Sequence, residues 1–155
     1  MRFAVRSALV AGLLMTVALP SAFAEDKAED AVKYRESLMD IVGGHTKSFF
    51  AIAGSKVSHP EDLAWHADSL AAASKRVKGA FAQSTAGSGV KTAAKDGIWA
   101  AGSEFPKLAG DFEKAAADLS AAVNGKDPAA IGAAAKALGG ACKACHDVYR
   151  APAKT

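Results

Sequence analysis

Hydrophobic residues recur at intervals of three or four along most of the chain, the spacing that places them on one face of a helix. The first such segment extends from Asp26 to about Gly44, and the same pattern continues to Ala53. The pair Gly43-Gly44 weakens the prediction over that extension, because glycine disfavours a helix interior. The apolar positions of this helix include Val32, Leu38, Met39 and Val42.

A second helix is predicted from the residues that would begin it. Ser58 precedes Pro60, and Glu61 stands three residues after Ser58, which is the spacing of a capping box. The helix is predicted to end near Ser84, before a loop of small residues over 85–89. Its apolar positions are Leu63, Leu70, Val77 and Phe81.

The third predicted helix begins at Val90 or at Asp96 and ends at Asn124. Pro106 lies inside it, and a proline there removes a backbone hydrogen bond and clashes with the preceding turn. Two arrangements stay open: a short helix around Ile98 followed by a new helix, or one kinked helix. The apolar stripe comprises Ile98, Trp99, Phe105, Leu108, Phe112, Leu119 and Val123.

Asp127 and Pro128 predict the start of a fourth helix, as N-cap and first-turn proline, and it is expected to end just before Pro152. Four amphipathic helices with short connections predict an all-α fold, an antiparallel four-helix bundle. The many alanines leave little bulk for its core, which leaves room for a large bound group. The apolar side of the fourth helix comprises Ile131, Ala135, Leu138, Cys142, Cys145 and Tyr149.

The composition of the first 24 residues indicates that they are not part of the folded domain. Among the 155 residues, Met1–Ala24 have the features of a secretory signal peptide: a positive start, an apolar run over 7–19 and a small-residue cleavage site at 22–24. The run is too short to span a membrane. Residues 25–155 are therefore predicted to form one exported, periplasmic domain without a membrane anchor. Cleavage removes two of 19 basic and none of 16 acidic residues, and the remaining net charge of +1 gives no reason to expect nucleic-acid binding.

The chemistry is concentrated in Cys142-Lys143-Ala144-Cys145-His146, the Cys-x-x-Cys-His arrangement of c-type haem attachment. Each thiol can form a thioether with one haem vinyl group, and the adjacent imidazole can reach the iron. On a helix, Cys142, Cys145 and His146 lie on one face. A structural zinc site would need a further Cys or His pair, and a thioredoxin-like pair would need a βαβ context. We therefore predict one covalently attached haem c.

The position of this motif near the C-terminus of a four-helix chain resembles cytochrome c′ and its class II cytochrome c relatives. The resemblance extends to residues 29–35 with Met39, to Ile98-Trp99 with Phe105 and Phe112, and to residues 142–150.

The resemblance implies a role for six residues. Cys142 and Cys145 would hold the haem, and His146 would be the proximal iron ligand. Arg150 would lie beside the proximal pocket and Arg35 near a haem propionate. The resemblance also places Met39 at the distal side of the iron, and it implies a homodimer formed through the first two helices.

Each of these residues also has a purely structural interpretation. By spacing alone, Met39 is core filling, and Arg35 and Arg150 are solvated charges. The aromatic residues Trp99, Phe105 and Phe112 are expected in the core, some of them against the haem edge. The remaining histidines, His45, His59 and His66, are expected at the surface or at helix caps.

Two functions follow from the resemblance. In the first, the iron is five-coordinate and binds NO or CO in an apolar distal pocket. In the second, His146 and Met39 both bind the iron, and the protein carries electrons between redox partner proteins. Tyr34-Arg35 favours the first function, because low-spin relatives often lack that arginine. Catalysis has little support, because no acid–base pair adjoins the motif, so the chain is not expected to be an enzyme.

Overall fold

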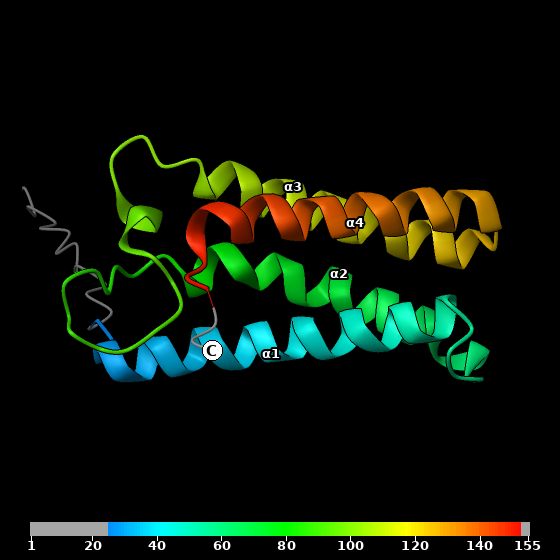
Figure 1. The fold of residues 1–155 in the computed structure, drawn as a ribbon, viewed down its shortest axis with the longest axis horizontal. Coiled ribbons are helices and arrows are strands. Elements are labelled where there is room, and N and C mark those ends of the chain that lie inside the picture. The colour runs from blue at the N-terminus through cyan, green and yellow to red at the C-terminus, as the bar shows by residue number, and fades with distance from the viewer. Residues whose placement is uncertain (1–24, 153–155) are drawn as a thin grey trace, which may run out of the picture.

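Four long helices run antiparallel in the computed structural model, which describes residues 25–152 (Figure 1). The all-α fold predicted from the sequence is confirmed. The first helix continues through Gly43 and Gly44 because buried Val42 and Phe49 on either side pack into the core, which outweighs the low helix propensity of glycine. The long helices are α1 (Ala28–Ala53), α2 (Leu63–Ala80), α3 (Phe105–Gly125) and α4 (Pro128–Tyr149).

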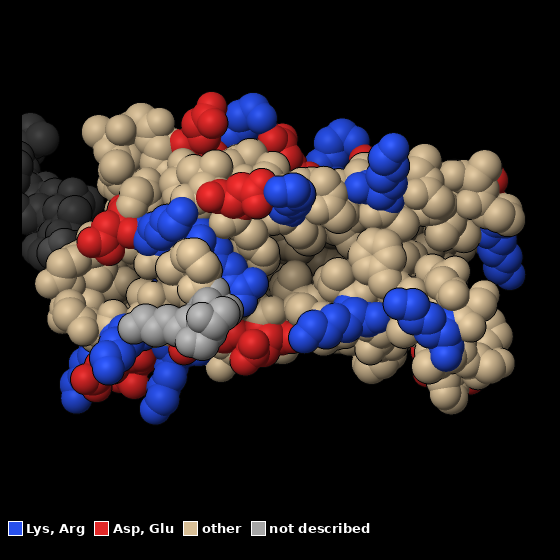
Figure 2. All heavy atoms as spheres, in the orientation of Figure 1, with Lys and Arg blue, Asp and Glu red and all other residues tan. Residues whose placement is uncertain are grey.

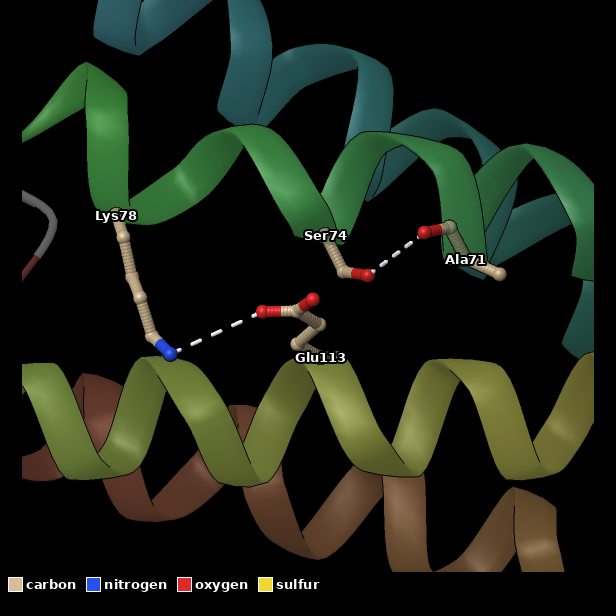
Figure 3. Close-up of polar contacts among 4 residues, drawn as sticks. All are labelled: Ala71, Ser74, Lys78 and Glu113. Atoms are coloured by element: carbon tan, nitrogen blue, oxygen red, sulfur yellow. Dashed lines mark hydrogen bonds and ion pairs between the residues drawn. The ribbon is translucent and has the colours of Figure 1, made fainter.

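The core lies along the packed helix pairs α1–α2, α2–α3 and α3–α4. Many of its buried members are alanines, and its largest fully buried side chains are Phe49, Leu70, Leu119 and Leu138. At the surface of the α2–α3 contact, Lys78 crosses Gly110 and approaches Glu113 with an N–O distance of 3.8 Å (Figure 3). Glycine at position 110 leaves space for the lysine stem. Basic and acidic side chains are interspersed over the face seen in Figure 2.

The start of α2 differs from the prediction. A short 3-10 helix, η1 (Pro60–Asp62), precedes α2, and no side-chain hydrogen bond caps either element. The predicted capping box between Ser58 and Glu61 is therefore wrong; the Glu61 carboxylate instead lies 3.5 Å from Nδ1 of His59. The helix ends at Ala80, earlier than the predicted Ser84.

Pro106 begins a helix and does not kink one. It is the second residue of α3, where a missing backbone N–H costs nothing, and Phe105 before it is buried. The short 3-10 helix η2 (Asp96–Trp99) precedes α3, so the first of the two arrangements left open by the sequence is the observed one.

The turn between α3 and α4 confirms the predicted N-cap at Asp127, but α3 includes Gly125 and ends one residue later than the predicted Asn124. Lys126 takes a left-handed conformation after α3, and the Asp127 carboxylate then accepts hydrogen bonds from the backbone N–H of Ala129 (2.9 Å) and of Ala130 (3.4 Å). This N-cap begins α4.

We predict that Asp127→Ala lowers the free energy of unfolding by about 1 kcal/mol, because the first N–H groups of α4 lose their acceptor. Urea denaturation of the haem-loaded protein measures the change. Ser58→Ala is the matched control: no cap bond from Ser58 exists, so its unfolding midpoint should stay within experimental error. Equal effects of the two substitutions would contradict the assignment.

No helix within residues 25–152 is long and apolar enough to cross a membrane. The predicted signal peptide, Met1–Ala24, lies outside the described residues, as do residues 153–155.

Candidate functional site

The predicted site residues gather at one end of the bundle, where α1 and α3 begin and α2 and α4 end (Figure 1). The last turns of α4 carry Cys142, Cys145 and His146. Both cysteines are free thiols, half-buried and packed against the main hydrophobic core, whereas His146 is exposed. The helix therefore anchors the two sulfur atoms against the core and presents the imidazole at its surface.

Burial sets the protonation of these groups. It raises the pKa of the Cys142 thiol, and it raises the pKa of Cys145 together with the nearby Cys142. Both sulfur atoms are thus held as neutral thiols. Although His146 is exposed, partial loss of solvent around its ring, followed by the charge of Arg150, lowers the pKa of His146, and Asp147 acts in the opposite direction. The imidazole is therefore kept neutral, which is the form that ligates a metal.

Arg35 is buried, with 2% of its surface exposed, so the interpretation as a solvated charge is wrong. Its Nη2 donates to Thr85 Oγ1 at 2.5 Å, and its Nη1 donates to the backbone carbonyl of Gln83 at 3.3 Å. Both acceptors lie in the segment after α2. Within residues 25–152, Nε of Arg35 is the one buried side-chain nitrogen or oxygen without a hydrogen-bond partner.

Two aromatic rings hold the guanidinium in place. Its central carbon lies 5.3 Å from the ring centroid of Phe81 and 5.0 Å from that of Trp99, both within cation–π range. The Trp99 indole N–H donates to the Phe81 carbonyl at 2.8 Å, which fixes the rings relative to each other. Burial lowers the pKa of Arg35, and no carboxylate pairs with it among the described residues. A buried cation with a spare donor fits an anionic partner such as a haem propionate.

Met39 lies one turn after Arg35 on α1. Its side chain is half-buried and packs against the same hydrophobic core as Cys142 and Cys145. The structure thus brings Met39 of α1 and both cysteines of α4 to one hydrophobic core. Trp99, Phe105 and Phe112 lie in or against that core, as predicted.

Arg150 is exposed and takes part in an isolated antiparallel bridge with Ala94. The backbone on either side is fixed by two hydrogen bonds: Lys95 N–H donates to the Tyr149 carbonyl at 2.9 Å, and Ala151 N–H donates to the Ala93 carbonyl at 2.7 Å. The segment before η2 therefore holds the end of α4.

Tyr149 is the residue at this end that the sequence analysis left without a role. Its buried hydroxyl accepts hydrogen bonds from Ser103 Oγ (3.0 Å) and from the backbone N–H of Glu104 (2.9 Å), immediately before α3. Its ring makes an edge contact with Phe105. Its position three residues after His146 could have indicated a positioning residue.

We predict that Tyr149→Phe destabilises the protein by about 0.5–1.5 kcal/mol, because the Glu104 N–H and the Ser103 hydroxyl lose their shared acceptor. Thermal and urea unfolding of the haem-loaded variant measure the loss. Tyr34 offers the control, since it is 58% exposed and Tyr34→Phe should leave stability unchanged. A loss below about 0.5 kcal/mol in Tyr149→Phe would show that the hydroxyl contacts are not structural.

The histidines outside the motif do not all follow the prediction. His59 is exposed, as expected. His66 is buried, which contradicts the expectation of a surface or capping residue, and its Nδ1 lies 2.9 Å from Nδ1 of half-buried His45. Sequence spacing on two different helices gives no signal for such a contact.

Comparison with known proteins decides the family. A sequence model of the family described as Cytochrome C′ matches residues 30–150. The chain belongs to the cytochrome c′ family. Members of this family bind one covalently attached c-type haem, so the cofactor predicted from Cys142–His146 is confirmed.

Individual relatives agree with this assignment. Cytochrome c′ of Pararhodospirillum photometricum is 36% identical over 77 residues, which are 50% of this chain and 61% of that protein. The crystal structure of cytochrome c′ from Rubrivivax gelatinosus is 32% identical and has a TM-score of 0.72, covering 80% of this chain and 97% of that one. A ferrous variant of Alcaligenes xylosoxidans cytochrome c prime with bound NO is 27% identical, with a TM-score of 0.73 over 84% of this chain and all of that one.

Proposed function

We propose that this cytochrome c′ binds NO or CO at a haem iron whose sixth coordination position is open. The observation that carries the proposal is Arg35, buried between Phe81 and Trp99 with one donor unpaired, one turn before half-buried Met39. The NO complex of the Alcaligenes relative supports the ligand class.

Each site residue has a distinct part in this proposal. Cys142 and Cys145 hold the haem through thioethers, and His146 is the proximal ligand. Arg35, whose Nε is unpaired, would hold a propionate and balance its charge, and Arg150 would lie beside the proximal pocket. When bound, the haem supplies an iron that changes between ferric and ferrous states and takes small diatomic ligands.

Met39 is proposed to close the distal side without bonding to the iron. Its thioether carries no hydrogen-bond donor and its neighbours belong to the hydrophobic core, so the distal side is apolar. Such a site excludes water and polar anions and admits uncharged diatomic molecules. The proposed function is therefore the binding of a diatomic ligand at the iron, without an enzymatic reaction.

An optical spectrum of the purified protein tests this function. We expect a high-spin spectrum in both the ferric and the ferrous state, and a low-spin spectrum after CO is added to the ferrous protein. A low-spin resting spectrum that CO does not alter would overturn the proposal. It would instead support the second candidate, an electron carrier with His146 and Met39 as iron ligands and redox proteins as partners.

We also propose that the chain is exported to the periplasm and cleaved after Ala24. The basis is the signal-peptide pattern of Met1–Ala24. Export would also bring the Cys142–His146 motif to the compartment where bacteria attach c-type haem. Intact mass spectrometry of the periplasmic fraction should give the mass of residues 25–155 plus one haem. A mass that includes residue 1 would contradict the cleavage.

A second copy of the chain is the proposed partner for the α1–α2 face. Large hydrophobic side chains are exposed there, chiefly Tyr34, Ile41 and Trp65. We predict that Ile41→Glu weakens the homodimer at least about tenfold in dissociation constant, since it places a charge in an apolar contact. Sedimentation at several protein concentrations measures this. Val148→Glu, at an equally exposed apolar position on α4, should leave the homodimer unchanged.

A further inference from the structure

The two imidazoles of His45 and His66 meet at the α1–α2 contact, in the second half of α1 and the first turn of α2, whereas the haem-binding motif lies in the last turns of α4. His66 stands in the first turn of α2 and is buried, and His45 is half-buried on α1. Trp65 flanks both rings, with centroid distances of 5.1 Å to His45 and 4.6 Å to His66. The two histidines have no part in the proposed gas binding.

The geometry of the pair matches the needs of a metal ion. The two Nδ1 atoms are 2.9 Å apart. Imidazole nitrogens bind transition metals at about 2.0–2.1 Å, so two ligands at a right angle around one metal lie about 2.9 Å apart. Right-angled nitrogen ligands are typical of tetragonal Cu²⁺ sites.

The surroundings leave both rings available as ligands. Within residues 25–152, neither ring forms an ion pair, and their mutual contact is the one hydrogen bond that either makes. Burial, and then the neighbouring His66, lowers the pKa of His45, which keeps its imidazole neutral at pH 7.

We propose that His45 and His66 form a two-imidazole binding site for a divalent transition metal, with Cu²⁺ as the preferred ion. In the metal-free pair, one Nδ1 carries the proton that the other accepts. On binding, that proton moves to Nε2 of its own ring, and both Nδ1 lone pairs face the metal. No net proton is released from the neutral pair, and water completes the coordination. Cu²⁺ is the tightest-binding divalent ion in the Irving–Williams order.

Another group of donors provides the matched control. The ligand atoms of His59, Glu61 and Asp62 lie within 4.8 Å of one another, but His59, just before η1, and Glu61 are exposed. Fixing these exposed side chains around an ion would cost conformational entropy, whereas the buried His66 is already fixed. We therefore expect His59 to contribute nothing.

The test is a titration of the haem-loaded protein with Cu²⁺, at one fixed protein concentration because Trp65 belongs to the proposed dimer face. Calorimetry should give one Cu²⁺ per chain, and the electron paramagnetic resonance spectrum of Cu²⁺ should show coupling to two imidazole nitrogens. His45→Gln and His66→Gln should each weaken binding at least about tenfold, or 1.4 kcal/mol. His59→Gln should not change it.

Three results would overturn the proposal: no binding by the wild-type protein, unchanged binding in both Gln variants, or loss of binding in His59→Gln. If either variant fails to fold, the wild-type spectrum decides the question, because coupling to fewer than two nitrogens excludes the pair. These measurements report on Cu²⁺ and not on the haem iron. The metal-site proposal can therefore fail while the gas-binding proposal holds, and the reverse is also true.

Discussion

Replacing Cys142 and Cys145 together by Ala should release the haem from the chain on a denaturing gel and strongly destabilise the fold. Both sulfur atoms are half-buried against the core, so the proposed thioethers fix the haem there. Seven of the 20 buried hydrophobic residues are alanines, so we expect the haem to supply part of the apolar contact at this end of the core. If the attached haem acts as a ligand at about a thousand times its dissociation constant, its loss costs about 4 kcal/mol.

The single variants serve as controls for this experiment. Cys142→Ala and Cys145→Ala each retain one thiol, so each should keep haem on the denaturing gel and lose less stability than the double variant. Haem staining that persists in the double variant would refute attachment through these cysteines. If the double variant lacks haem but unfolds at the same temperature as the wild-type protein, the haem does not stabilise the fold.

Local signals in the sequence predicted the helices well. Asp127 and Pro128 predicted the start of α4, because the side chain of an N-cap bonds to residues two and three positions away. Ser58 and Glu61 carry a similar signal, yet Pro60 begins a 3-10 turn there and the cap is not formed. The sequence offered both interpretations of Pro106, and the burial of Phe105 and Ile98 on separate elements decided between them.

Contacts between distant segments gave no such signal. Arg35 was identified only by resemblance, because its partners Gln83 and Thr85 lie in a loop about 50 residues away that has no periodic pattern. The same holds for the contact between Tyr149 and Ser103. Periodicity reports which face of a helix is buried, and it does not report which polar atoms meet there.

The histidine pair shows this limit most clearly. A histidine at the first turn of a helix fits a cap or a surface position as well as a core position. What buries His66 is the approach of α1, which places His45 against it. That approach depends on the packing of two whole helices, so no short motif encodes it.

Met39→Ala should separate the two candidate functions by its effect on the iron. If the sulfur lies beside the iron without bonding, the substitution enlarges an apolar distal pocket. The resting spectrum then stays high-spin, and CO association accelerates at least about tenfold, which corresponds to a barrier lower by 1.4 kcal/mol. If the sulfur is bonded, the resting spectrum changes from low-spin to high-spin.

Met39→Leu is the variant that distinguishes bulk from ligation. Leucine nearly preserves the volume of methionine but has no sulfur, so a steric role predicts wild-type spectra and nearly wild-type CO rates. Ile131→Ala controls for a general loosening of the core, since Ile131 packs against the same core near the start of α4, away from the motif. It should lower stability without changing CO binding.

We expect the steric outcome because α1 is fixed at Arg35, one turn before Met39, by bonds to Thr85 and Gln83 and by the rings of Phe81 and Trp99. A thioether is a weak iron ligand, and moving an anchored helix to form the bond would cost these contacts. Stopped-flow CO binding and optical spectra of the two Met39 variants measure the outcome. A low-spin wild-type spectrum that both variants lose would instead establish Met39 as a ligand and make electron transfer the leading function.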